Sequence, residues 1–371
     1  MSYPFMEIPI EAPILSRCGY KPNEVVNHLQ KALRDAGAHS TARCIHLAAD
    51  LVCSGGLLSL FKLLWEYALI NVGLGSPRVF LYLAQRMKEI EAIAKELPDE
   101  MAYSNEKFQI RIGEIILVLR EAPTRSVVPW PKVSVETHDA GWIRGAVVDP
   151  VTESAALRLT WKPEGDFSLL RTAGGQISKA INEGSTERAL FWVKWLLEED
   201  AILRKSQKGA ALSTIERGPA TLNSKARTEA SYFILHLYSE IYKELARKQL
   251  IRMHDEFRSL IELWNTPPKG LSGSAKKQVL TILTQILTEV PRWKVPAAPG
   301  LIKDPIQLSN AVKQVPVFFK EVLAYDSPKQ VHKLEKAFKQ KAATEKPAAK
   351  KVDGPMTKEE AFDRAFELYM K

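Results

Sequence analysis

One long apolar stretch, residues 57–78, limits most strongly what this chain can fold into. Between positions 57 and 72 the plainly polar residues are Ser59, Lys62, Glu66 and Asn71. A helix that is apolar on nearly every side belongs inside a bundle of other helices. Its two charges, and a length short of the roughly 20 apolar residues of a membrane span, argue against a transmembrane helix. The stretch therefore predicts a central helix in a mainly α-helical fold.

Turn-forming residues divide the surrounding sequence into a first helical unit, residues 23–132. Apolar residues recur at helical spacing in four further segments, residues 23–36, 40–54, 77–95 and 104–120. Before this unit, residues 1–22 contain Pro4, Pro9, Pro13 and Pro22. Because proline interrupts helices, these residues predict an extended arm.

A second helical unit is predicted at residues 171–298, after a segment of different character. Residues 133–170 alternate between polar and apolar and are rich in valine, threonine and tryptophan, with turn signals at Ala140-Gly141 and Asp149-Pro150. This pattern is typical of short strands, so it predicts a small β-hairpin insert. Helical spacing then returns in residues 176–182, 185–204, 225–265 and 276–289.

The two helical units resemble each other in sequence. Both begin with a helix containing Lys-Ala, a turn of small residues and a helix led by Ser-Thr. Both end with an aliphatic helix, a Glu-Ala-Pro or Glu-Val-Pro sequence and a proline-rich exit. One interpretation is an internal repeat of two related five-helix units. The other is that helical hairpins resemble one another by pattern alone.

The C-terminal part of the chain predicts a helical extension followed by a flexible tail. Residues 299–340 have helical spacing, whereas residues 341–355 are poor in apolar residues and predict a disordered basic linker. Residues 356–371 combine Thr357 and Glu360, a capping pattern, with an apolar stripe. They predict a short amphipathic helix. We favour a docking helix, whose partner-facing residues would be Phe362, Phe366 and Tyr369, over a tail that packs back on the body.

The positive charge of the chain is concentrated in two segments that could bind nucleic acid. The net charge is +9, and residues 329–351 hold eight lysines against two glutamates. The predicted phosphate-binding residues of this tail are Lys329, Lys333, Lys336, Lys339, Lys341, Lys346, Lys350 and Lys351. A basic loop adds Arg204, Lys205 and Lys208, followed by Arg217, Lys225 and Arg227. Both segments lack interleaved aromatic residues for base stacking, so solvated surface is the alternative interpretation.

Motifs for catalysis or metal binding are weak. The chain has three cysteines, and its metal-like cluster is His39, Cys44, His46 and Cys53. On one helix Cys44 and His46 point about 200° apart, so they cannot hold one ion together. We find no nucleophile elbow or zinc-protease motif. The sequence therefore predicts a protein that is not an enzyme, with no cofactor and no metal.

The N-terminus and the cysteine content favour an intracellular location. The first residues, MSYPFMEIPIEAPIL, are acidic and proline-rich and do not resemble a signal peptide. Three scattered cysteines do not form a disulfide framework. We expect the protein in the cytoplasm or nucleus, or inside a virus particle, and not secreted or bound to a membrane.

Residues 23–87 resemble a known helical module. The sequence NEVVNHLQKALRDAGAHSTARCIHLAADLVCSGGLLSLFKLLWEYALINVGLGSPRVFLYLAQRM is similar to the oligomerisation (collar) domain of clamp-loader-like AAA+ ATPases of the RarA type. The matching positions are Val72-Gly73 and Pro77-Arg78, and EAPTRS at residues 121–126 resembles the end of that module. The resemblance implies a helical assembly fold, with structural or assembly roles for Trp65, Gly73, Pro77 and Arg78.

The chain also departs from this family. Ile70-Asn71 stands where the family carries an acidic pair, and GLSGSAKKQ and GAALSTIERG lack the spacing of a phosphate-binding loop. The resemblance therefore implies no ATP hydrolysis. The leading hypothesis is a helical scaffold for protein assembly or self-association that is associated with DNA in replication or repair. The alternatives are a structural component of a large particle such as a virion, and an enzyme whose site leaves no local motif.

Overall fold

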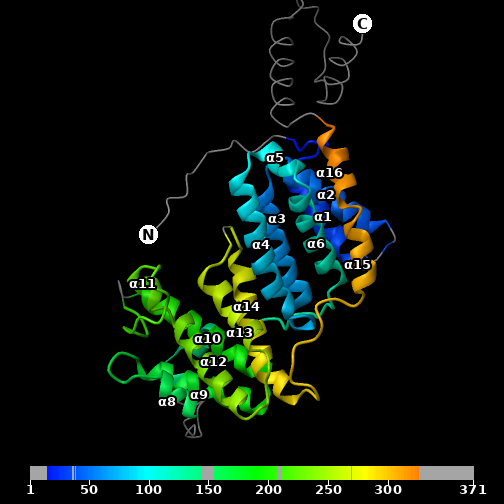
Figure 1. Cartoon of the computed structure of the whole chain (residues 1–371). Helices are drawn as coiled ribbons and strands as arrows, with labels where there is room; N and C mark the ends of the chain where they lie inside the picture. The colour runs from blue at the N-terminus through cyan, green and yellow to red at the C-terminus, as the bar shows by residue number, and fades with distance from the viewer. Residues whose placement is uncertain are drawn as a thin grey trace, which may run out of the picture.

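The computed structural model describes residues 15–325, except residues 36, 38, 140, 144–153, 207–209 and 269. This part of the chain is mainly α-helical, as predicted, and contains isolated β-bridges but no strand. The helices form two groups, one above the other in Figure 1, with the first unit in blue and cyan and the second in green and yellow.

The first unit follows the helical pattern of the sequence closely. Its elements are α1 (Pro22–Arg34), α2 (Ser40–Cys53), α3 (Leu57–Tyr67), the π-helix η1 (Ala68–Val72), the 3₁₀-helix η2 (Gly73–Gly75), α4 (Arg78–Glu96), α5 (Asp99–Ser104) and α6 (Glu106–Glu121). Asn105 begins α6 because its side chain accepts a hydrogen bond from the backbone N–H of Phe108 at 3.0 Å.

The central helix is buried, as its composition predicts. By length and composition alone, Leu57–Gly75 would also suit a membrane span, but most of this segment is buried inside the helical body. Leu60, Leu64 and Leu69 are among the most buried side chains of the described chain. The sequence did not predict that the helix widens into η1 and then tightens into η2 before Ser76.

The second unit is built around α14. Its elements are α9 (Ser168–Glu183), α10 (Thr186–Ser206), α11 (Ser224–Arg227), α12 (Ala230–Arg247), α13 (His254–Asn265), α14 (Gly273–Glu289) and the 3₁₀-helix η4 (Val290–Arg292). Helix α14 contacts α9, α10, α12 and α13. Two hydroxyl pairs, the buried Tyr238–Thr284 and the partly buried Thr186–Thr288, each have an oxygen–oxygen distance of 2.6 Å and tie α14 to α12 and α10.

The predicted β-hairpin insert at residues 133–170 is wrong for the part that the structure describes. Val135–His138 forms the 3₁₀-helix η3, and Ala155–Thr160 forms α8. Ser154 begins α8 by accepting a hydrogen bond from the N–H of Leu157 at 3.1 Å. Trp142 packs against Trp192 of α10, with ring centroids 5.8 Å apart. The apolar alternation thus reflects contacts with α10 and not with a partner strand.

The two units contact each other through the end of the central helix. Helix α4 contacts α13, while η1 and η2 contact α14. Two ion pairs cross the same boundary, Arg78–Glu256 at 3.5 Å and Arg125–Glu289 at 2.5 Å. The buried hydroxyl of Ser76 donates to the carbonyls of Gly300 and Leu301, which fixes the segment that leaves the second unit.

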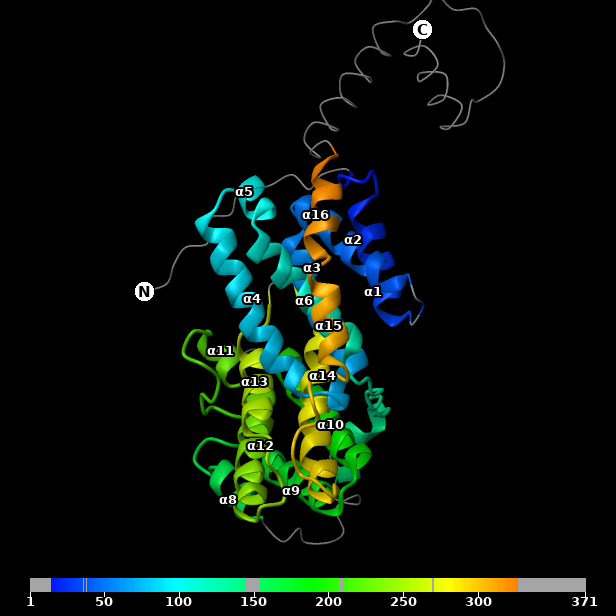
Figure 2. The ribbon, with the colours of Figure 1, turned by 45° about the vertical axis from the view of Figure 1, so that its right-hand side comes forward.

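The chain then returns to the first unit. Helices α15 (Pro305–Val312) and α16 (Val315–Leu323) pack on α6, and α16 also contacts α2 and α5. In Figure 2 these helices, in orange, run beside α6 and α2. The described part of the predicted helical extension, residues 299–325, thus contains two helices. The close approach of α16 to α6 requires Gly113, since a Cβ atom there would overlap Val315.

Candidate functional site

Of the predicted assembly residues, Arg78 is the one with an ion pair across the boundary between the two units, to Glu256 of α13. Trp65, Gly73 and Pro77 are buried. Gly73 has a φ of +48°, and its Cβ position is 3.3 Å from the carbonyl oxygen of Arg125, which follows α6 in the first unit. An assembly role for these residues stays a prediction.

The basic loop after α10 is anchored mainly by its arginines. Arg204, predicted to bind nucleic acid, donates to Asp200 at 2.8 Å and to the carbonyl oxygens of Lys225 and Thr228. Its guanidinium is thereby committed to internal bonds. Lys205 and Lys225 are exposed, whereas Lys208 lies outside the described residues.

Arg217 of the same loop is buried against a carboxylate. Its guanidinium donates to both oxygens of Asp166, and the Asp166 and Arg217 side chains are only 0% and 7% exposed. Arg227 pairs with Glu216 at 2.5 Å. The structure therefore assigns Arg204, Arg217 and Arg227 a structural role, and the free charge of this loop is that of its lysines.

The tail residues proposed for nucleic-acid binding and docking all lie outside the described residues. They are Lys329, Lys333, Lys336, Lys339, Lys341, Lys346, Lys350 and Lys351, and Phe362, Phe366 and Tyr369. What the structure describes is the point from which this segment leaves the body, at the end of α16 (Figure 1).

That point is fixed by Arg17, in a cluster that we call the terminal clamp: Arg17, Cys53, Ser54, Glu100 and Tyr325. The backbone N–H of Arg17 donates to Ser54 Oγ and its Nε to the carbonyl of Cys53, both at 2.9 Å. Its Nη1 donates to the carbonyl of Tyr325 at 3.3 Å, and its Nη2 pairs with Glu100 of α5. Arg17 is buried, and its bonds to Ser54 and Cys53 are shielded from water, whereas Glu100 and Tyr325 are largely exposed.

The terminal clamp places both ends of the described chain at one end of the molecule. Residues 15–17 lie against the end of α2, and Tyr325 follows α16 on the same side, near α5 (Figures 1 and 2). Within the predicted arm of residues 1–22, Ser16 and Arg17 are buried against the body. Residues 1–14 lie outside the described part.

The cysteines do not form a reactive site. Burial raises the pKa of Cys44 to about 11 and, with the negative charge of Asp50, the pKa of Cys18 to about 12. The Cys18 sulfur lies 3.6 Å from Nε2 of His46, a spacing that suits a nucleophile and its base. However, a thiol with so high a pKa stays protonated at neutral pH. Among the described residues, no three His, Cys, Asp or Glu side chains are arranged to hold a metal ion.

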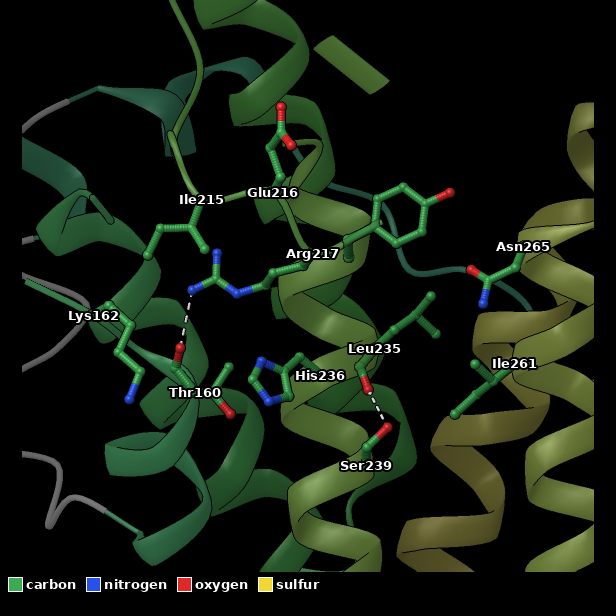
Figure 3. A pocket seen from close by; sticks show the side chains of 11 residues that line it. Thr160, Lys162, Ile215, Glu216, Arg217, Leu235, His236, Ser239, Ile261 and Asn265 are labelled. Carbon is green, nitrogen blue, oxygen red and sulfur yellow. Dashed lines mark hydrogen bonds between the residues drawn. The ribbon is translucent and has the colours of Figure 1, made fainter. Parts of the chain in front are cut away.

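A pocket of about 460 Å³ opens in the second unit, and it shares no residue with the terminal clamp. Figure 3 shows Lys162, Thr160 and His236 on one side of it and Leu235, Ile261 and Asn265 on the other. The loop residues Ile215, Glu216 and Arg217 close a further wall. The pocket thus combines a basic side with an apolar side.

The sequence did not predict the terminal clamp or the pocket in the second unit, and the reason differs for each. Arg17 stands alone within a proline-rich segment, and no local pattern marks it as a buried anchor. The pocket collects residues from α12, α13, the end of α8 and a distant loop. The residue that could have indicated the pocket is Asp166, a single acid before a helix. Its partner Arg217 is 51 residues away in the sequence, so the pairing leaves no local pattern.

Comparison with known proteins gives no family assignment for this chain. No protein-family model matches it, and neither a curated protein nor a solved structure does so.

Proposed function

We propose that this protein is a non-enzymatic helical scaffold that uses the end of the molecule at the terminal clamp to engage its partners, with its lysine-rich tail on DNA. The observation that carries the proposal is the clamp itself. It places residues 15–17, which follow the proline-rich N-terminal segment, and Tyr325, which precedes the segment with eight lysines, at the same end of the body.

The packing of the body supports a scaffold role. The two helical units are joined by α4–α13 contacts, by ion pairs and by the return of α15 and α16 onto the first unit. A body joined at so many places can hold two partners at a fixed separation. The similarity of residues 23–87 to the collar domain of clamp-loader-like ATPases agrees with an assembly role, in replication or repair.

Charge supports the nucleic-acid part of the proposal. Eight lysines within residues 329–351 can neutralise several phosphates without reading sequence. The arginines of the loop after α10 are committed to internal bonds. The tail holds eight lysines against two glutamates within one segment, so we place the DNA contact there.

The experiment is a salt titration of duplex DNA binding by the full-length protein. We expect binding to weaken about a thousandfold or more between roughly 50 and 200 mM salt, as for proteins that contact six or more phosphates. Changing the eight tail lysines to glutamine should abolish this binding.

The matched control changes Lys205 and Lys225, the exposed lysines near α11, to glutamine. We expect this variant to retain most of the affinity. Binding that is absent, insensitive to salt, or lost in the control but retained in the tail variant contradicts the proposal.

A further inference from the structure

The pocket in the second unit is held open by the ion pair beside it. Both oxygens of Asp166 accept hydrogen bonds from Arg217, and Ser213 donates to Asp166 at 2.6 Å. The Arg217 side chain also donates to the carbonyl of Thr160 at 3.0 Å. These bonds fix the loop to the end of α8, so the wall that it forms is present without a ligand.

The basic side of the pocket has one uncompensated charge. The charge of Arg217 is balanced by Asp166, and that of Glu216 by Arg227. Lys162 is half-buried and has no ion pair with any described residue. Among the charges near the pocket, Lys162 is thus the one free to attract an anion.

His236 adds a donor to this side without adding a charge. Burial, with the positive charges of Arg217 and Lys162, lowers the pKa of His236 from its ordinary value. Its ring is therefore neutral at pH 7 and offers one N–H. Glu240, 3.8 Å from the ring, is shared with Lys243, which it contacts at 2.7 Å.

Two further polar groups of the pocket offer acceptors. The hydroxyl of Ser239 donates to the carbonyl of Leu235, so it keeps only lone pairs for a ligand. The Oδ1 atom of Asn265 is buried and has no hydrogen-bond partner. A ligand with hydroxyl or amino donors would satisfy these atoms.

The apolar side of the pocket offers a surface for a flat group. Leu235 and Ile261 face it from α12 and α13, and Tyr232 and Ile215 also line it (Figure 3). The volume of about 460 Å³ lies in the range of small-molecule sites and suits a single small ligand.

We propose that this pocket binds a nucleoside monophosphate. The phosphate lies at Lys162 and His236, hydroxyl and amino groups of the sugar and base donate to Ser239 and Asn265, and the base packs against Leu235 and Ile261. The inference is independent of the proposed scaffold function, because none of these residues belongs to the tail or to the terminal clamp.

The test is calorimetric titration of the full-length protein with AMP, GMP, CMP and UMP, and with adenosine and inorganic phosphate as fragments. We expect at least one monophosphate to bind, and each fragment to bind at least about tenfold more weakly. Lys162→Gln should weaken the binding of the monophosphate about tenfold or more. Lys248→Gln, which removes the same charge from an exposed site paired with Glu244, should leave it unchanged.

Three results would overturn the inference. They are the absence of binding at millimolar concentrations, equal loss in the Lys162 and Lys248 variants, and equal affinity for inorganic phosphate and the monophosphates. Repeating the titration with the tail lysines changed to glutamine separates this site from the proposed function. Retained binding supports the pocket whatever the outcome of the DNA experiment, whereas lost binding overturns the pocket.

Discussion

Replacing Asp166 by alanine is expected to lower the free energy of unfolding by about 3–5 kcal/mol, the usual cost of breaking a buried ion pair from one side. The variant leaves Arg217 buried without a counter-ion and removes the acceptor of Ser213. The loss is read from urea unfolding followed by circular dichroism. Because the ion pair holds the loop against α8, the same variant should also lose the pocket.

A double variant tests whether the loss of stability comes from leaving Arg217 without a counter-ion. Adding Arg217→Met to Asp166→Ala removes the unpaired charge, so we expect the double variant to be more stable than Asp166→Ala alone. The control is Glu262→Ala, which breaks an exposed pair with Arg258 whose side chains are 58% and 70% exposed. Such a pair contributes about 0–1 kcal/mol. Equal losses for Asp166→Ala and Glu262→Ala would contradict the structural role of the buried pair.

Replacing Gly113 by alanine is the second large effect that we expect, at about 1–3 kcal/mol of lost stability. The added methyl group would overlap the fully buried side chain of Val315, where α16 packs on α6. The overlap pushes α16 away from the first unit, so limited proteolysis should cut residues 299–325 faster. Unfolding in urea measures the stability.

Two further variants make this result specific. Val315→Ala in the Gly113→Ala background removes the overlapping atoms and should restore part of the stability. Gly273→Ala makes the same substitution in the first turn of α14, where a Cβ meets nothing within 4 Å, and should cost little. If Gly113→Ala behaves like Gly273→Ala, the return of α16 onto the first unit is wrong.

The sequence was sufficient to predict most of the helices, because their apolar spacing and their ends are local signals. The predicted segments 40–54 and 77–95 differ from α2 and α4 by one residue at the ends. The apolar stretch from Leu57 was correctly placed in the core. The possible repeat of the two units remains a prediction.

Long-range contacts explain where sequence reasoning failed. Residues 133–143 looked like a strand, but Trp142 packs against Trp192 and Trp195 of α10 and Val135 is exposed. The loop after α10 looked like a basic surface, but its arginines reach acids such as Asp166 and Asp200. Charge counted along the sequence does not reveal which cations are already paired. A contact such as that of Arg17 with Tyr325 joins residues that are 308 positions apart, so no local pattern predicts it.

The most direct test of the proposed function is to map where DNA lies on the full-length protein by lysine crosslinking and mass spectrometry. Crosslinks near the terminal clamp can be told apart from crosslinks at exposed lysines elsewhere on the body, because each crosslinked lysine is identified by its position. We predict crosslinks within residues 329–351 and at Lys21, which is exposed next to the clamp. Crosslinks confined to Lys205 and Lys225, near α11 in the second unit, would contradict it.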